Sequence, residues 1–186
     1  MAEEAGTWVQ AWGDVPPQVL FVDDEPELLA TMRQNFRRQK FKIFTAESGP
    51  SALEILAQQK IEVVVSDERM PQMSGSEFLT EVRKTQPNTM RILLTGQVSI
   101  EAVAKAVNEG EIYRFLLKPV HKTILLHAIN QSLDYLALVS ETKRLRSTVA
   151  EQEDRLQSLE KYHPGITKVN RDHDGAILLD LEGYEL

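Results

Sequence analysis

The sequence predicts a doubly wound α/β domain that continues into one long C-terminal helix. Short apolar runs of strand-like composition alternate with stretches in which apolar residues recur at helical spacing. Polar or charged residues follow directly after four of these apolar runs. Near the C-terminus, the stretch from Lys122 to Tyr162 contains neither proline nor glycine, and His163-Pro164-Gly165 supplies a stop. The alternation predicts a parallel sheet with helices between its strands.

The strands and helices follow in chain order from these patterns. Strands are expected at about 19–22, 41–46, 61–65, 92–94 and 115–117. Helices are expected at 26–40, at 51–59, around Phe78, Leu79 and Val82, and at 99–108. Gly75 is expected to loosen the loop before the third helix. The fourth helix has a thin apolar face, and such weakly held elements are the ones that can shift when a switch is thrown.

The polar residues at the strand ends form a chemically complete set. They are Asp23-Asp24, Asp67, Thr95 and Lys118. In an open parallel sheet, groups at the carboxyl ends of the strands share one crevice, so we expect these side chains to converge. A carboxylate such as Asp67 can attack a phosphoryl group and form an acyl phosphate if the charge on the phosphoryl oxygens is neutralised. The acidic pair can hold Mg²⁺, while Lys118 and Thr95 can contact the remaining phosphoryl oxygens.

Each motif alone has a plainer explanation. Asp23-Asp24 before Glu25-Pro26 could merely cap a helix. Thr95-Gly96 could be a strand end with a turn, and Lys118-Pro119 could be a surface lysine before a stop. Phe115 alone would be a core aromatic. The motifs around Asp23-Asp24, Asp67, Thr95 and Lys118 occur together in chain order, each after a strand-like run. Their joint occurrence favours the phosphoacceptor site.

The chain resembles the receiver domains of two-component response regulators over about residues 18 to 135. The resemblance rests on Val22-Asp23-Asp24-Glu25-Pro26, Asp67-Glu68-Arg69-Met70-Pro71 followed by Gly75, Leu94-Thr95-Gly96 and Phe115-Leu116-Leu117-Lys118-Pro119. It implies a flavodoxin-like sheet of five parallel strands. It also implies that Asp67 is the phosphoacceptor and that Asp23, Asp24 and Asp67 bind Mg²⁺, with Asp24 ligating the ion directly.

The same resemblance implies roles for the residues around Asp67. Thr95 and Phe115 would be the switch pair, and Lys118 would bind the phosphoryl group. Arg69 and Gln97 flank the site and would tune how long the phosphoryl group lasts. The Lys118-Pro119 bond is often cis in this family. The phosphoryl donor would be a cognate histidine kinase or a phosphotransfer protein.

The long helix carries a heptad pattern over its C-terminal part. About 40 residues make roughly 60 Å of helix at 1.5 Å per residue, which is far too long to pack on one small domain. The a and d positions repeat with the heptad period at Tyr135, Leu138, Thr142, Leu145, Val149, Gln152, Leu156 and Leu159. A parallel partner in this register would pair Glu141 with Arg146 and Arg155 with Glu160. We therefore expect a parallel homodimeric coiled coil. The alternative is a solvated helix whose stripe packs on another protein or on a missing domain of the same chain.

The two ends of the chain are expected to add little to the fold. Trp8 and Trp12 are spaced for a short helical turn on an apolar surface, but a frayed tail is favoured. Beyond the stop, 166–169 and 176–179 flank a loop ending in Asp174-Gly175, which indicates a β-hairpin. A lone hairpin is marginal in water, so it would need another sheet, a second chain or a partner to lie on.

Composition narrows the classes of function. The chain of 186 residues has no cysteine, which excludes disulfides and thiolate metal sites. Its net charge of −7 argues against nonspecific nucleic-acid binding. No apolar stretch approaches the roughly 20 residues of a membrane span, and the acidic N-terminus lacks the features of a signal peptide. The protein is therefore expected to be cytoplasmic, without direct nucleic-acid or membrane contacts.

These observations divide the chain into an N-terminal tail at 1–17, a receiver domain at 18–134, a coiled-coil extension at 135–162 and a C-terminal tail at 163–186. The sequence predicts a response regulator that accepts a phosphoryl group on Asp67 and signals through dimer or partner-protein contacts. It would assist its own phosphorylation and dephosphorylation, without acting as an enzyme on external substrates. The alternatives are a constitutive scaffold or adaptor on the same fold, or the regulatory fragment of a larger effector, such as a phosphohydrolase or a transcription factor.

Overall fold

A computed structural model describes residues 8–12, 15–96 and 112–163 of the chain. The strands are β1 (Gln18–Val22), β2 (Lys42–Ala46), β3 (Val63–Asp67), β4 (Met90–Thr95) and β5 (Arg114–Leu117). The helices are α1 (Trp8–Ala11), α2 (Pro26–Phe36), α3 (Gly49–Gln58), α4 (Gly75–Thr85) and α6 (Lys122–Tyr162). The expected fourth helix at 99–108, Gln97 and the expected hairpin beyond the stop lie outside the described residues.

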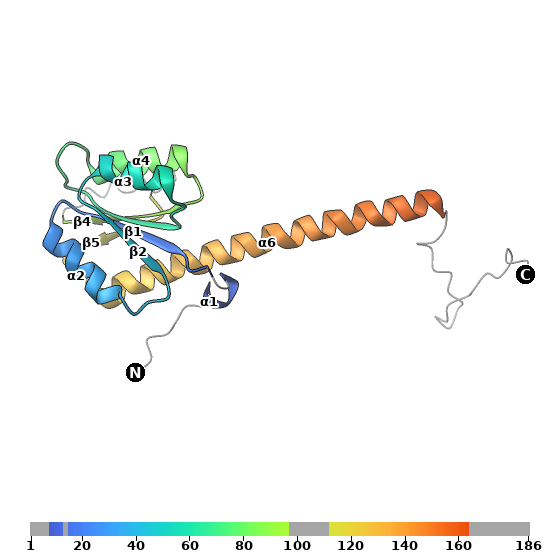
Figure 1. Ribbon diagram of the computed structural model, residues 1–186, viewed down its shortest axis with the longest axis horizontal. Coiled ribbons are helices and arrows are strands. Elements are labelled where there is room, and N and C mark those ends of the chain that lie inside the picture. The colour runs from blue at the N-terminus through green and yellow to red at the C-terminus, as the bar shows by residue number, and fades with distance from the viewer. Residues whose placement is uncertain (1–7, 13–14, 97–111, 164–186) are drawn as a thin grey trace, which may run out of the picture. The chain divides into compact units, whose positions relative to one another are not determined.

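The strands form one parallel sheet in the order β2-β1-β3-β4-β5. This order and the helices between the strands confirm the predicted doubly wound sheet and the long C-terminal helix (Figure 1). The chain leaves β1 toward β2 on one side and later returns to β3 on its other side. Such a reversal creates a crevice at the carboxyl ends of the two central strands.

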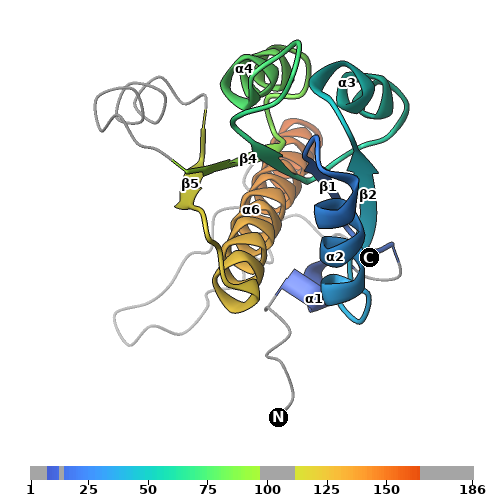
Figure 2. The same ribbon diagram turned by 90° about the vertical axis from the view of Figure 1, so that its left-hand side faces the viewer.

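Side chains of the central strands supply two apolar layers, one on each face of the sheet. Val19 and Phe21 pack with α2 and the start of α6, whereas Leu20 and Val22 pack with α3 and α4. Figure 2 shows α3 and α4 on one side of the sheet and α2 with the start of α6 on the other. Successive residues of a strand point to opposite faces. The two central strands therefore contain unbroken apolar runs, at 19–22 and 63–65, because both faces of the sheet are covered.

Helix α2 ends at Phe36, before the expected end near Lys40. The ring of Phe36 stacks on Phe21 with centroids 5.6 Å apart, and it also contacts Phe41. Between Phe36 and Phe41 the chain offers only polar side chains. A further helical turn would therefore bury nothing, and the chain turns into β2 instead.

The N-terminal tryptophan segment is ordered on the receiver, so the favoured prediction of a frayed tail is wrong for Trp8–Ala11. Trp8 is only 3% exposed and joins the apolar layer of α2 and α6. Its backbone N–H donates to Asp134 Oδ1 at 2.7 Å, and its indole N–H donates to Asn130 Oδ1 at 3.2 Å. Helix α1 is thus docked on α6 by one buried ring and two hydrogen bonds.

Helix α6 begins and ends at the residues that the sequence predicted. The chain divides into two units, residues 1–139 and 140–186. In the first unit, α6 buries six residues: Leu125, Leu126, Ala128, Ile129, Ser132 and Leu133. From Ser140 to Leu159 every residue of α6 is exposed. Within the described ranges, no helix has the length and apolar character needed to cross a membrane.

Candidate phosphorylation site

The carboxyl edge of the sheet gathers the acidic and basic residues that the sequence singled out. Asp67 is the last residue of β3 and Thr95 the last residue of β4. Asp23 comes directly after β1, and Lys118 directly after β5. Because the strands are parallel and in register, all four residues lie at one edge.

Lys118 bridges the two buried carboxylates of this edge. Its Nζ lies 2.6 Å from Asp67 Oδ1 and 3.2 Å from Asp23 Oδ2. The side chains of Asp23 and Asp67 are almost fully buried, whereas that of Lys118 is 30% exposed. Burial lowers the pKa of Lys118, but its hydrogen bond to Asp67 and the charge of Asp23 outweigh this effect and raise the pKa. Lys118 therefore carries its positive charge between the two carboxylates at neutral pH.

The backbone fixes the second oxygen of each carboxylate. Asp67 Oδ2 accepts from the Arg69 N–H at 2.9 Å, and Asp23 Oδ1 accepts from the Glu25 N–H at 3.0 Å. Each carboxylate thus uses one oxygen for a backbone donor and the other for Lys118. This arrangement orients both groups, because each has contacts on two sides.

Gly75 is buried against the backbone of Asp67, so the prediction that it loosens the loop is wrong. A Cβ at this position would overlap the carbonyl oxygen of Asp67 and would lie 2.8 Å from Leu93 Cδ1. Ser74 caps α4, and its side chain and that of Glu77 form a reciprocal capping box. The absence of a side chain at Gly75 lets the first turn of α4 sit directly on the end of β3.

The predicted switch pair lies on neighbouring strands. Thr95 is buried at the end of β4 and is paired in register with Leu117. Phe115 is paired with Leu93, is half-buried, and packs against the apolar layer of α3 and α4. The structure thus brings Thr95 and Phe115 to adjacent strands near the acidic edge.

Of the two predicted tuning residues, Arg69 lies in the described part of the chain. Arg69 is exposed, and its Nη2 lies 3.5 Å from the position that a Cβ on Gly96 would occupy. Its side chain therefore lies against the end of β4. Gln97 is outside the described residues. The Lys118-Pro119 bond is cis.

The donor set fits Mg²⁺ through two carboxylates. Among the described residues, no group of three or more histidine, cysteine or acidic side chains is close enough together to hold a metal ion. Asp24 is exposed, whereas Asp23 and Asp67 face the same ammonium group. The ammonium group of Lys118 contacts both carboxylates, so the two are close enough together to contact one cation. Mg²⁺ typically uses one or two carboxylates and keeps several waters, so Asp23 and Asp67 suit it.

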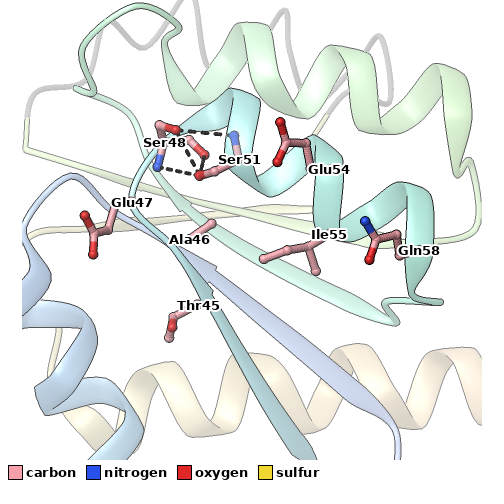
Figure 3. A pocket seen from close by; sticks show the side chains of 8 residues that line it. All are labelled: Thr45, Ala46, Glu47, Ser48, Ser51, Glu54, Ile55 and Gln58. Atoms are coloured by element: carbon pink, nitrogen blue, oxygen red, sulfur yellow. Dashed lines mark hydrogen bonds between the residues drawn. The ribbon is translucent and has the colours of Figure 1, made fainter.

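Within the described part of the receiver, hollows are also found away from the acidic edge itself. One, of about 540 Å³, lies beside the end of β2 and along α3 and is lined by Thr45, Ala46, Glu47, Ser48, Ser51, Glu54, Ile55 and Gln58 (Figure 3). Another, of about 560 Å³, lies between α2 and the start of α6, and Lys118 forms part of its wall. The first contains none of the predicted site residues, and the second contains only Lys118.

Glu68 is a site neighbour that the sequence analysis did not single out. Its carboxylate accepts hydrogen bonds from the N–H and hydroxyl of Ser76. No sequence pattern indicated this contact, because Glu68 and Ser76 are brought together only by the path of the loop between β3 and α4.

The fold is shared with known proteins. Residues 19–130 match the model of the response regulator receiver domain. The transcriptional regulatory protein GlrR of Escherichia coli (strain K12) is 34% identical over 146 residues, which cover 78% of this chain and 33% of that protein. A probable cyclic di-GMP phosphodiesterase of Vibrio cholerae serotype O1 is 34% identical over 143 residues, covering 75% of this chain and 30% of that protein.

Solved structures agree with these relatives. The receiver domain of an HD domain-containing protein from Pseudomonas fluorescens Pf-5 has a TM-score of 0.61 and is 36% identical, and the match covers 65% of this chain and 97% of that domain. This chain spans about a third of the length of the curated relatives it matches. Its sheet order, its motifs and the family match lead to one conclusion: the chain belongs to the family of response regulator receiver domains.

Proposed function

We propose that this protein is a response regulator that accepts a phosphoryl group on Asp67. The observation that carries the proposal is the ammonium group of Lys118, which lies 2.6 Å from Asp67 Oδ1 and also contacts Asp23. A carboxylate becomes an effective nucleophile toward phosphorus only where positive charge is ready to stabilise the phosphoryl oxygens. Lys118 supplies such a charge beside the nucleophile.

The residues of the acidic edge divide the work of phosphoryl transfer. One oxygen of Asp67 forms the new bond to phosphorus while the bond from phosphorus to the donor atom breaks and the donor keeps that electron pair. The Arg69 N–H holds Asp67 in place, and Lys118 binds a phosphoryl oxygen. The hydroxyl of Thr95 is a donor for a second phosphoryl oxygen. Arg69, and Gln97 by its predicted position, affect how readily water reaches the acyl phosphate.

The proposal includes Mg²⁺ held by Asp23 and Asp67, with Asp24 as an additional oxygen donor at the same edge. The ion would neutralise negative charge on the phosphoryl oxygens during transfer. With the ion bound, Lys118 would be released from Asp23 and would remain available to the phosphoryl group. Asp23 keeps its orientation through the Glu25 N–H in either case.

The phosphoryl donor is a cognate histidine kinase or phosphotransfer protein, and the protein does not act on external substrates. The relatives leave one specific alternative, because GlrR is a transcriptional regulatory protein and the Vibrio cholerae relative is a probable phosphodiesterase. This chain would then be the regulatory part of such an effector. A constitutive scaffold is less consistent with the site, because a docking surface has no need of a buried, complete acidic edge.

The first test is phosphate labelling with a small acyl phosphate donor and Mg²⁺. The wild-type protein should incorporate phosphate that hydroxylamine releases, as expected for an acyl phosphate. Asp67→Asn should abolish this incorporation, because the amide is a far weaker nucleophile. Asp154→Asn, an exposed change of the same type on α6, is the matched control and should label normally. Labelling of Asp67→Asn at the wild-type rate would contradict the proposal.

We propose further that α6 forms a parallel homodimeric coiled coil. The support is the exposure of its seam: Leu138, Leu145, Val149, Leu156 and Leu159 are each between 47% and 67% exposed. The helix is 41 residues long, and its apolar side chains return on one face with the heptad period. The predicted interhelical pair of Glu141 with Arg146 has a competitor within the helix. Arg144 of the same helix already binds the Glu141 carboxylate through two hydrogen bonds, at 2.7 and 2.8 Å.

Cysteine cross-linking tests the register, since the natural chain has no cysteine to interfere. Leu145→Cys places the thiol at a d position, where the two copies of a parallel, in-register dimer meet. Ser147→Cys lies on the outer face of the helix and is the matched control. We expect a disulfide-linked dimer for Leu145→Cys only. Equal cross-linking of the two variants would contradict the seam.

Light scattering with Mg²⁺, with and without beryllofluoride as a stand-in for the phosphoryl group, tests how assembly relates to phosphorylation. Dimers under both conditions would indicate a standing coiled coil. Dimers only with beryllofluoride would make assembly itself the output. Monomers under both conditions would contradict the homodimer and would direct attention to another protein as the partner of the seam.

A further inference from the structure

Glu68 joins three elements at the point where Asp67 leaves the sheet. Its backbone N–H donates to the Leu94 carbonyl on β4 at 2.9 Å. Its own carbonyl accepts from the Gly75 N–H at 3.0 Å. Its carboxylate Oε2 accepts from the Ser76 N–H at 3.0 Å and from the Ser76 hydroxyl at 2.8 Å. One residue therefore ties the end of β3 to β4 and to the first turn of α4.

These contacts determine where the next peptide group points. The N–H that orients Asp67 Oδ2 belongs to Arg69, which follows Glu68 directly. Rotation of the backbone at Glu68 would withdraw this N–H from the carboxylate. On its other side, Glu68 is held against α4, whose Gly75 rests on the backbone of Asp67. The side chain of Glu68 thus fixes the loop after Asp67 to the first turn of α4.

The negative charge of Glu68 is held where it repels an approaching phosphoryl group least. A second carboxylate next to the nucleophile would repel that group if it faced the site. Here it is bound to the first turn of α4, where free N–H groups and the positive end of the helix dipole stabilise negative charge. Glu68 is half-buried, and its carboxylate accepts two hydrogen bonds there, so its orientation is fixed toward α4.

We propose that Glu68 is a positioning residue for the phosphorylation of Asp67. It holds the Arg69 N–H on Asp67 Oδ2 and so leaves Oδ1 aimed at Lys118. This inference rests on the proposed function of Asp67. The competing explanation is that Glu68 merely caps α4, as Glu77 does through its contacts with the N–H and hydroxyl of Ser74.

The capping box supplies the matched control for this distinction. Glu68 and Glu77 both accept an N–H and a hydroxyl at the N-terminus of α4, but only Glu68 adjoins the site. We expect Glu68→Ala to slow phosphate incorporation from a small acyl phosphate donor by about three- to tenfold, the cost of a small misplacement of reacting groups. Glu77→Ala should label at the wild-type rate although it loses its own cap. Glu68→Gln keeps an acceptor for Ser76 and should retain most of the rate.

Equal rates for Glu68→Ala and Glu77→Ala would overturn the inference, and so would equal rates for Glu68→Gln and Glu68→Ala. This failure differs from failure of the proposed function. If only the inference about Glu68 fails, phosphate would still be confined to Asp67, and Asp67→Asn would still abolish phosphate incorporation. If the proposed function fails, Asp67→Asn would incorporate phosphate like the wild type.

A second measurement does not depend on phosphorylation. Amide hydrogen exchange followed by NMR reports directly on the Arg69 N–H. Glu68→Ala should speed exchange of this amide by about tenfold or more through local opening of the loop, while Glu77→Ala leaves it unchanged. An Arg69 amide that remains as protected in Glu68→Ala as in the wild type would show that Glu68 does not position this donor.

Discussion

The two parts of α6 carry the same kind of side chain and give it different surroundings. Leu125, Ile129 and Leu133 are buried under the sheet and α1. Leu145 and Leu156, which belong to the heptad pattern of the second part, are each about half exposed. Both parts have apolar side chains on one face, so the apolar pattern alone does not tell which face is covered in the folded chain. The first part is covered by other segments of the chain, whereas the second is exposed from Ser140 to Leu159 among the described residues.

This difference separates mutations by what they should change. Substitutions in the first unit should lower the free energy of unfolding, because their contacts lie within the chain. Substitutions in the exposed part of α6 should change association and leave unfolding of the receiver almost untouched. Four predictions test this separation.

Gly75→Ala should have the largest effect on stability. The added methyl group meets the backbone of Asp67, which cannot rotate away as a side chain could. We expect a loss of about 3 kcal/mol or more in the free energy of unfolding, at the upper end of the cost of overpacking a core. Denaturant unfolding followed by circular dichroism measures it.

Gly96→Ala is the matched control, because its methyl group would make an ordinary contact at 3.5 Å with Arg69. We expect a change within about 0.5 kcal/mol for this variant, as at other open positions. Similar unfolding curves for the two alanine variants would contradict the close approach of α4 to Asp67.

Trp8→Ala should lower the free energy of unfolding by about 2 kcal/mol, in the range for burying one large apolar side chain. The loss is limited because α1 can detach without unfolding the sheet. Val15→Ala removes apolar atoms at a position that is 71% exposed and should change stability very little. A Trp8→Ala protein as stable as the wild type would mean that α1 does not cover the first part of α6 in solution.

Leu145→Asp should leave the unfolding curve of the receiver within about 0.5 kcal/mol of wild type, because the side chain is 52% exposed. Dimers, if α6 forms them, should weaken at least tenfold, which corresponds to about 1.4 kcal/mol. Ser147→Asp adds the same charge on the outer face and should not change the molar mass measured by light scattering. Unfolding of the receiver by Leu145→Asp would break the comparison between the two parts of α6.

The smallest effect is a pH dependence carried by Lys118. The pKa of Lys118 in the folded protein is raised above its ordinary value of 10.5. A raised pKa of a basic group stabilises the fold below the unfolded-state pKa, and this contribution is lost as the pH rises through the folded-state pKa. The stability difference between wild type and Lys118→Met should therefore be constant from neutral pH to about pH 9 and shrink at higher pH.

Unfolding measured over this pH range checks the prediction. Tyrosine titration affects both proteins equally, so the comparison with Lys118→Met isolates the lysine. A difference that already disappears near neutral pH would mean that Lys118 does not carry its charge between Asp23 and Asp67.

Much of the receiver could be predicted from local sequence. Strands buried on both faces produce apolar runs that stand out. Asp23, Thr95 and Lys118 follow such runs directly, and Asp67 follows one after a single serine. The bounds of α6 were also predictable, because proline and glycine are absent between its ends. Phe36 ends α2 earlier than expected, since the polar residues after it have no apolar surface to bury.

Other features depended on residues that are distant in the chain. Trp8 looked like part of a frayed tail because its partners, Asn130 and Asp134, lie more than a hundred residues away. Gly75 looked like a source of loop flexibility, although the structure uses its missing side chain for a close contact with Asp67.

The sequence by itself determined the residue types of the candidate phosphorylation site, the order of strands and helices, and the length of α6, because each depends on composition and period along the chain. Only the tertiary structure decided that Lys118 bridges Asp67 and Asp23, that Glu68 is tied to Ser76, and that the apolar face of α6 is covered in one part and exposed in the other. These features are distances between segments. The folded backbone sets such distances, and no local pattern of residues encodes them.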